Sequence, residues 1–240
     1  MVIKKNMFVQ KGFAGIGEIL SNDAYRSYIN YEGADNTNLS GGRFRPLSIV
    51  SFAMEQSIFG KTLGNQYLEE RDKLLSMEQN TNNVNDIETR RALVKKIDKE
   101  IDAQTLKLAP IRHMFQIVYY ALCCLLLYWF ISLVVPNNKW LPFLAALFFA
   151  VHPIHTEVVA NLKSRDEIFS LSFILLTSIF YIQYFQQHKK KFAWLAVLFY
   201  VLAFLSKEYA FVLVILIPLY YYLTQKTSVV NMLKANWFLG

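Results

Sequence analysis

The chain has 240 residues, of which 54% are hydrophobic and 15% are aromatic. Soluble domains are usually about 45–50% apolar, and the excess here lies in residues 113–224, which hold nearly all the long apolar runs. The formal net charge of +7 does not indicate a nucleic-acid partner. The basic residues are scattered through the polar half or stand at the ends of apolar runs, as they do in membrane proteins.

Residues 1–65 are rich in glycine, and we expect them to form a loop segment of short helices and turns. The glycines at 12, 15 and 17 do not have the spacing of a dinucleotide-binding fingerprint. Later in this segment Arg43 and Arg45 bracket Phe44 after a pair of glycines. Two interpretations of these arginines are open: they bind an anionic ligand, or they form salt bridges with acidic residues at the ends of membrane helices.

Residues 66–112 predict a polar helical hairpin. Residues 66–79 and 86–108 are rich in Glu, Lys, Arg and Leu, and residues 80–85 have the composition of a turn. Asn85 followed by Glu88 fits a capping box at the start of the second helix. A stripe of apolar residues with helical spacing runs along that helix: Ile87, Val94, Ile97, Ile101 and Leu108. We expect the hairpin to act as a spacer or docking element.

Residues 113–224 predict about five transmembrane helices, so the expected fold is mainly α: a polytopic membrane helical bundle with an extracytoplasmic loop domain that contains the hairpin. Cys123 and Cys124 lie inside the first run and indicate neither a disulfide nor a metal site. Residues 225–240 are expected to be a cytoplasmic loop or the start of a further helix. The expected helices lie at residues 113–135, 140–162, 167–187, 191–206 and 207–224.

The basic cluster at residues 188–191 orients these helices, because short cytoplasmic loops collect Lys and Arg. Counting outward from it places residues 1–112, 152–167 and 206–208 on the extracytoplasmic side. Ionisable residues gather at these outer ends, either as a site at the membrane–water boundary or as ordinary interfacial charges that cap helices. They are His152, His155, Glu157, Lys163, Arg165, Asp166, Glu167, Lys207 and Glu208.

The segment from His152 to Glu157 does not have the geometry of a zinc site, because Pro153 interrupts the helix and Glu157 would face away from the histidines. We therefore expect no metal and favour hydrogen bonding to a substrate or a neighbouring loop. Arg165 is unusual at a helix N-terminus, where negative charge is favoured. It is suited to a phosphate group, or it pairs with Asp166 or Glu208.

Four motifs follow one another along the chain: GRFRPLS at 42–48, HPIHTEVVA at 152–160, SRDE at 164–167 and SKE at 206–208. In this order they resemble the transmembrane-and-tetratricopeptide-repeat (TPR) protein O-mannosyltransferase family and its bacterial relatives, within the C-type (GT-C) glycosyltransferase superfamily. The resemblance covers residues 1–60 and 110–224, and the segment from His152 to Glu157 is its most specific part.

The resemblance implies transfer of a sugar, mannose in characterised relatives, from a polyprenyl-phosphate carrier to protein hydroxyls on the extracytoplasmic side. The lipid-linked sugar is then the donor substrate, without a further cofactor. Membrane lipid and an acceptor protein are the partners, and a bacterial inner (cytoplasmic) membrane is the expected location. By similarity the donor-binding residues are Arg43, Arg45, His152, His155, Glu157, Arg165, Asp166, Lys207 and Glu208, with Arg165 or Lys207 stabilising the leaving phosphate.

The sequence departs from the family pattern in three places. The family's first membrane helix and its catalytic acidic pair are expected upstream of Met1, residues 66–108 are an insertion, and the TPR repeats would follow Gly240. We therefore expect a fragment whose catalytic carboxylate is unassigned. The alternative is a non-catalytic multi-pass membrane scaffold or binding protein. A transporter is disfavoured, because the long apolar runs carry few polar residues at mid-membrane depth.

Overall fold

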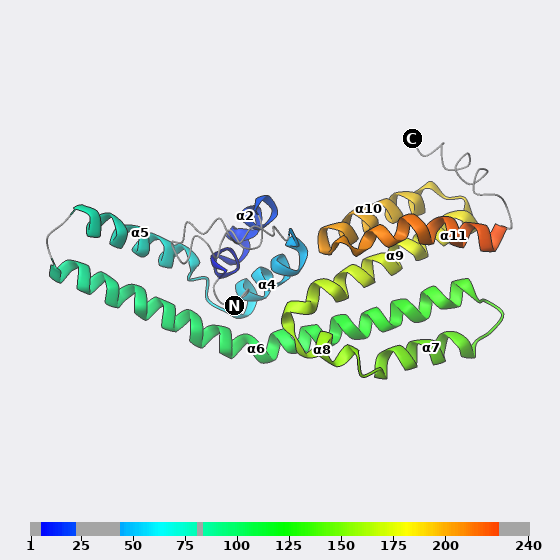
Figure 1. The fold of residues 1–240 in the computed structure, drawn as a ribbon, viewed down its shortest axis with the longest axis horizontal. Coiled ribbons are helices and arrows are strands. Elements are labelled where there is room, and N and C mark those ends of the chain that lie inside the picture. Colours follow the sequence, from blue (N-terminus) through cyan, green and yellow to red (C-terminus); the bar gives the residue numbers. More distant parts are fainter. Residues whose placement is uncertain (1–5, 23–43, 81–83, 226–240) are drawn as a thin grey trace. The chain divides into compact units, whose positions relative to one another are not determined.

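The computed structural model describes residues 6–22, 44–80 and 84–225, and these residues are mainly helical, as the sequence predicts (Figure 1). No strand occurs among them. The chain divides into two compact units. Unit 1 comprises residues 1–118 and 159–166, and unit 2 comprises residues 119–158 and 167–240.

The N-terminal part of unit 1 packs short helices on one longer helix. The short elements α1 (Met7–Gln10), η1 (Gly12–Gly15) and α2 (Ile16–Ser21) contact α4 (Pro46–Phe59). The chain turns after α1 at Gly12, whose φ of +64° is a conformation that glycine adopts without strain. Apolar side chains from α1, α2 and α4 form a buried cluster: Phe8, Val9, Ile19, Ile49, Phe52 and Ala53.

The predicted hairpin is present as α5 (Gly64–Asn80) and the first part of α6 (Val84–Val134), which lie side by side (Figure 1). The two helices are joined by a salt bridge of 2.9 Å between Arg90 and Glu70. The predicted apolar stripe supplies the packing, since its residues Ile97 and Ile101 are buried against Met7 of α1 and Tyr67 of α5.

The sequence predicts that the second helix of the hairpin and the first membrane helix are separate, with a boundary at residues 112–113. The structure has no helix end there, because α6 is one continuous helix of 51 residues with Pro110 inside it. A proline removes one hydrogen bond from a helix and often ends it. Here side chains before and after Pro110 are held by tertiary contacts: Leu108 and Arg112 are both buried, and Arg112 donates to Gln56 of α4 at 2.7 Å. These contacts carry the helix across the proline.

The helix expected at residues 140–162 is interrupted in the structure. The chain forms α7 (Trp140–Val151), leaves the helical conformation at His152, and resumes as α8 (His155–Ala160), followed by η2 (Leu162–Ser164). Pro153 cannot donate the hydrogen bond that would continue α7, and this explains the break.

The remaining helices lie close to the expected ranges. They are α9 (Arg165–Gln187), α10 (Lys190–Ser206) and α11 (Leu213–Gln225), with the 3-10 segment η3 (Glu208–Val212) before α11. The run expected as one helix over 207–224 therefore begins as a 3-10 segment. In unit 2, α9 contributes to two buried clusters, one centred on Ile174, Ala203 and Leu213 and the other on Cys123, Ile168 and Leu175.

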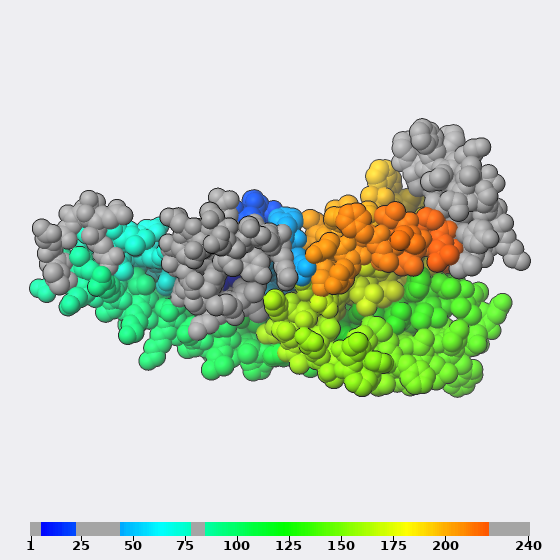
Figure 2. Space-filling model, viewed as in Figure 1, coloured from blue at the N-terminus to red at the C-terminus, as the bar shows by residue number. Residues whose placement is uncertain are grey.

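Two helical stretches are long and apolar enough to cross a membrane, Asn85–Val134 and Leu162–Gln187. The apolar helices Trp140–Val151 and Glu208–Tyr220 are shorter, so a count of about five spans stays a prediction. The surface of unit 2 is rich in large apolar side chains, with Trp140, Phe148, Trp194, Phe211 and Ile215 all more than 60% exposed. Figure 2 shows the atoms of α11, in orange, at the surface of this unit.

Candidate functional site

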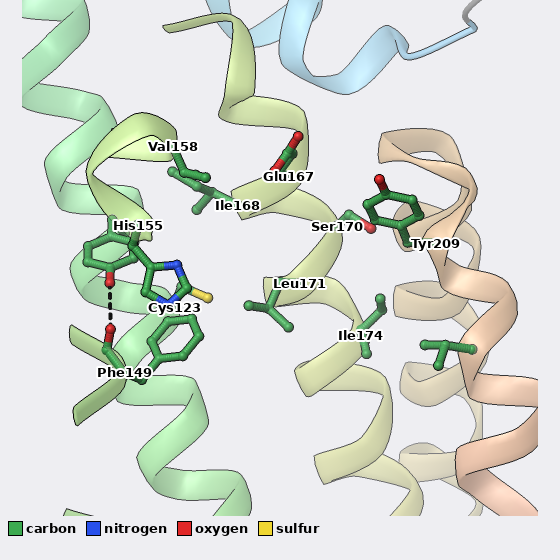
Figure 3. A pocket seen from close by; sticks show the side chains of 12 residues that line it. Cys123, Phe149, His155, Val158, Glu167, Ile168, Ser170, Leu171, Ile174 and Tyr209 are labelled. Carbon is green, nitrogen blue, oxygen red and sulfur yellow. Dashed lines mark hydrogen bonds between the residues drawn. The ribbon is translucent and has the colours of Figure 1, made fainter. Parts of the chain in front are cut away.

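A cavity of about 510 Å³ lies in unit 2 (Figure 3). Its interior is mostly apolar, and its polar groups come from different elements. Twelve residues line it: Tyr120, Cys123, Phe149, His155, Val158, Glu167, Ile168, Ser170, Leu171, Ile174, Tyr209 and Val212. We refer to it as the unit 2 pocket.

One wall of the pocket is formed at the break between α7 and α8. The Tyr120 hydroxyl donates to the carbonyl oxygens of Phe149 at 3.0 Å and Ala150 at 3.3 Å. Pro153 has no N–H to continue the helical bonding to Phe149, and the N–H of His152 bonds that carbonyl at 3.4 Å instead. The ring of His155 packs against that of Phe149 at a tilt of 40°, with 4.2 Å between ring centroids. The helix break thus turns His155 toward the cavity, as Figure 3 shows.

The opposite wall comes from the first turns of α9 and from η3 (Figure 3). Glu167 accepts from Lys207 at 2.9 Å, with the lysine side chain 7% exposed and the carboxylate side chain 42% exposed. The Lys207 ammonium also lies 4.2 Å from the centroid of the Tyr209 ring, a cation–π geometry. The lysine is therefore held in place, while its carboxylate partner faces the pocket.

The pocket suits an amphipathic ligand. Its interior of Cys123, Ile168, Leu171 and Ile174 offers no charge, whereas its edges carry a carboxylate, an imidazole and two phenol groups. Apolar cavities with a few convergent polar groups are the usual form of small-molecule sites. Glu167 lines the unit 2 pocket and pairs with Lys207, so a cation lies near the place where an anionic group of a ligand would bind.

A second group of the predicted site residues lies in unit 1, around Arg165. Its guanidinium donates to Gln116, Ser51, Glu55 and the carbonyl oxygen of Arg112, at 3.1, 2.9, 2.6 and 3.1 Å respectively. It also lies 3.9 Å from the centroid of the Phe52 ring. Arg165 is 0% exposed, so protein groups occupy the guanidinium from several sides.

Glu55 connects this arginine to a second one. Its Oε2 is 3.9 Å from Nε of Arg112, which is also buried. Burial raises the pKa of the Glu55 carboxyl, while Arg165 and then Arg112 act in the opposite direction. Two cations and one carboxylate therefore share a site removed from water. Such a site depends on its internal partners, because an uncompensated buried charge is costly.

Arg45 and Asp166 form a separate ion pair in unit 1, with Nη1 and Oδ2 2.6 Å apart and both side chains at most 15% exposed. This agrees with the salt-bridge interpretation of Arg45 and differs from the pairing of Arg165 with Asp166. Arg165 pairs with Glu55 instead. Arg43 lies outside the described residues.

The remaining predicted residues belong to unit 2 and are more exposed. His152 and Glu157 are exposed, and His152 Nδ1 accepts from the N–H of Ile154 at 3.2 Å, within its own turn. Glu208 is exposed at the start of η3. Among the described residues, no three His, Cys, Asp or Glu side chains are grouped as a metal would require.

Sequence reasoning missed several residues that build the two arrangements. Tyr120 and Cys123 of the pocket lie within an apolar run, where a tyrosine is typical of any membrane helix end. Glu55 and Gln116 hold Arg165, yet they are 110 and 49 residues away from it in the chain. Glu55 did carry one local signal, as an acidic residue within an otherwise apolar segment.

No family model matches the chain, and no solved structure matches it significantly. A 69-residue segment, 29% of this chain, is 38% identical to the protein O-mannosyl-transferase TMTC1 of Homo sapiens and covers 8% of that protein. The corresponding protein of Mus musculus is 35% identical over 69 residues, which are 7% of its length. The match thus spans a small part of these relatives, and it suggests a glycosyltransferase-like function over this short region.

Proposed function

We propose that the chain forms part of a membrane glycosyltransferase that moves a sugar from a polyprenyl-phosphate carrier to a protein hydroxyl. We take the sugar to be mannose, because the two relatives are named protein O-mannosyl-transferases. The observation that carries the proposal is the unit 2 pocket, which combines an apolar interior with polar edges and a neighbouring ion pair.

A polyprenyl-phosphate sugar has an apolar chain, a negatively charged phosphate and a polar sugar. The apolar interior around Leu171 and Ile174 is suited to isoprene units, since burial of apolar surface is favourable. The Lys207 ammonium is suited to the phosphate, and the hydrogen-bonding groups of His155 and Tyr209 are suited to the sugar. Glu167 holds Lys207 in position in the absence of the donor.

In the reaction the oxygen of the acceptor hydroxyl bonds to the anomeric carbon of the sugar, and the bond from that carbon to the phosphate oxygen breaks. The hydroxyl proton passes to a carboxylate base, and the polyprenyl phosphate leaves with its negative charge stabilised by a cation. We assign that cation to Lys207. Arg165 is a poorer candidate, because its guanidinium already binds Glu55, Gln116, Ser51 and a carbonyl oxygen in unit 1.

The proposal includes a multi-pass arrangement in a bacterial inner membrane, with residues 1–112 on the extracytoplasmic side. Two observations support it. The apolar side chains of α7, α10 and α11 are exposed on unit 2 and need an apolar environment. Lys189, Lys190 and Lys191 follow the C-terminal end of α9, as cytoplasmic lysines follow a span.

The test is binding of polyprenyl-phosphate mannose to the full chain in lipid nanodiscs. Loss of one charge-assisted contact costs about 1.5–3 kcal/mol. We therefore expect Lys207→Met to weaken binding by about tenfold or more. The matched control is Lys163→Met, which removes an exposed lysine outside the pocket and should leave affinity unchanged. Polyprenol, which lacks the phosphate, should bind Lys207→Met and the unsubstituted chain with the same affinity.

A chain that does not bind the donor, although its thermal unfolding is cooperative, would refute the transferase proposal. The alternative of a membrane scaffold would then account for the molecule. One observation favours that alternative: the buried Arg165 and the partly buried Arg45 are both engaged by carboxylates of the protein itself.

A further inference from the structure

The helix α4 carries apolar side chains on its outward side as well as on its buried side. The side facing the interior of unit 1 carries Glu55 and Gln56, which are 5% and 1% exposed and bind the two buried arginines. The outward side carries Met54 and Ile58, four residues apart and 43% and 61% exposed. The buried side also carries Ile49, Phe52 and Ala53, so the outward stripe is a second apolar face, where a helix packed in water would be polar.

Further apolar groups extend this outward stripe. Leu47 precedes Met54 with helical spacing and is partly exposed. Phe59 ends the helix with 46% exposure, and Phe13 is 54% exposed. Phe13 lies at the same end of α4, because its backbone N–H donates to Ser57 Oγ at 2.7 Å. No charged side chain of α4 faces outward, since the only charged residue of the helix, Glu55, is buried.

The position of α4 along α6 indicates what covers the stripe. The contacts of α4 and Gly60 fall where the apolar part of α6 begins: Gly60 lies near Leu108, Gln56 binds Arg112, and the Phe59 ring lies 5.9 Å from that of Phe115. Directly beyond, still in unit 1, Met114, Ile117 and Val118 of α6 are 54%, 57% and 45% exposed. The outward stripe of α4 is thus adjacent to the first lipid-facing turn of a helix that is long and apolar enough to cross a membrane.

We infer that α4 is a membrane-interface helix that inserts its Met54–Ile58 stripe into the outer boundary of the lipid bilayer and so anchors unit 1 to the membrane surface. Interfacial helices bury an apolar face by about 5–10 Å at the headgroup boundary. The inward polar residues of α4, Glu55 and Gln56, then stay inside the protein, where Arg165 and Arg112 donate hydrogen bonds to them. The inference rests on α6 crossing the membrane and does not depend on the transferase activity.

The test is the environment of spin labels on three exposed apolar positions of unit 1, in the full chain reconstituted into lipid nanodiscs. The labels are attached to Met54→Cys, Ile117→Cys and Leu93→Cys, each in a chain carrying Cys123→Ala and Cys124→Ala. Ile117 is the reference for lipid. Leu93 is the reference for water, because it lies 21 residues before Met114 on α6, about 30 Å at 1.5 Å per residue.

Oxygen concentrates in lipid, whereas a water-soluble nickel complex is excluded from it, so the ratio of the two collision rates reports the environment. We expect the ratio at Met54 to be at least about threefold that at Leu93 and to approach that at Ile117. A ratio at Met54 equal to that at Leu93 would place α4 in water and overturn the inference. Low accessibility to both reagents would mean that protein covers the stripe, with the same consequence. A ratio at Ile117 as low as that at Leu93 would show that this part of α6 is in water, and the inference, which needs α6 to cross the membrane, would be wrong.

Discussion

Arg165 shows how a residue can attract functional interpretation and have a structural explanation. A cation at a helix N-terminus is electrostatically unfavourable, and the sequence alone leaves a phosphate ligand as one way to account for it. In the structure Glu55 lies 2.6 Å from the guanidinium, and its negative charge compensates the cation. Arg165 therefore joins the start of α9 to α4 within unit 1.

We predict that Arg165→Met destabilises the chain far more than a surface substitution of the same type. It leaves Glu55 buried with Arg112 as the nearby cation, and breaking a buried pair costs roughly 3–5 kcal/mol. The control is Arg90→Met, which breaks a partly exposed pair with Glu70 and should cost about 0–1 kcal/mol. Thermal unfolding in lipid nanodiscs measures both. Equal effects, together with weaker donor binding by Arg165→Met, would restore the ligand-binding interpretation.

The same variant should show a characteristic pH dependence. Burial raises the pKa of Glu55 and Arg165 opposes that rise, so removing Arg165 raises the pKa further. A carboxyl whose pKa is raised by folding destabilises the fold as pH increases through that pKa, and the loss is absent below its ordinary value of 4.5. The deficit of Arg165→Met should therefore shrink from neutral pH toward that value. Adding Glu55→Gln should abolish the trend, and a trend that survives in the double variant would contradict this origin.

Single residues could be nominated from the sequence, but their partners could not. Pro153 indicated a helix break, which the structure has between α7 and α8, while the binding role given to the motif around His152 stays a prediction. Tyr120, which caps that break, is 29 positions away from Phe149 in the chain. Local sequence carries no information on such pairings, because they are fixed only when α6 and α7 pack together.

At the scale of elements, the glycines before α4 separate into two kinds. A Cβ at Gly15 would lie 2.0 Å from the backbone oxygen of Phe8, whereas a Cβ at Gly17 would meet nothing within 4 Å. Gly15 therefore allows α1 and η1 to pack closely. Gly17 lies in the helix α2 without such a constraint.

We predict that Gly15→Ala destabilises unit 1, because a backbone atom must move to admit the methyl group and overpacking costs about 1–3 kcal/mol. Gly17→Ala is the matched control, and it should be neutral or stabilise by about 0.4–1 kcal/mol, since alanine restricts the unfolded chain. Proteolytic susceptibility of the purified chain, followed by cleavage within residues 6–22, distinguishes the two. Similar protection in both variants would show that α1 and η1 do not pack as described.

Helix positions could be predicted from the sequence where a long run of residues is uniformly apolar. They could be predicted less well where a proline lies within such a run. The ranges expected for α9 and α10 came from long apolar runs and lie within a few residues of the observed helices. Pro110 and Pro153 have the same local chemistry, yet one lies inside α6 and the other between α7 and α8. Leu108 and Arg112, on either side of Pro110, are buried by tertiary contacts. These contacts cannot be predicted from the sequence.

At the scale of the whole molecule, the exposed apolar surface of unit 2 supports the membrane proposal more strongly than the helix lengths do. α7 has 12 residues and is about 18 Å long at 1.5 Å per residue, too short to span a hydrocarbon core of about 30 Å. Its side chains Trp140, Phe143, Leu147 and Phe148 are nevertheless between 44% and 73% exposed. Residues of this kind in a soluble protein would form an aggregation-prone surface.

The decisive helix for the topology is α9, whose 23 residues extend about 35 Å and can cross the hydrocarbon core. Exposed lysines stand beyond its two ends, Lys163 and Lys189. We predict that a cysteine at position 163 reacts with a membrane-impermeant maleimide on intact cells, whereas a cysteine at 189 reacts only after permeabilisation. Both substitutions are made in a chain carrying Cys123→Ala and Cys124→Ala, which should itself remain unlabelled. Labelling of both positions from the same side would mean that α9 does not cross, and the extracytoplasmic placement of residues 1–112 would fall with it.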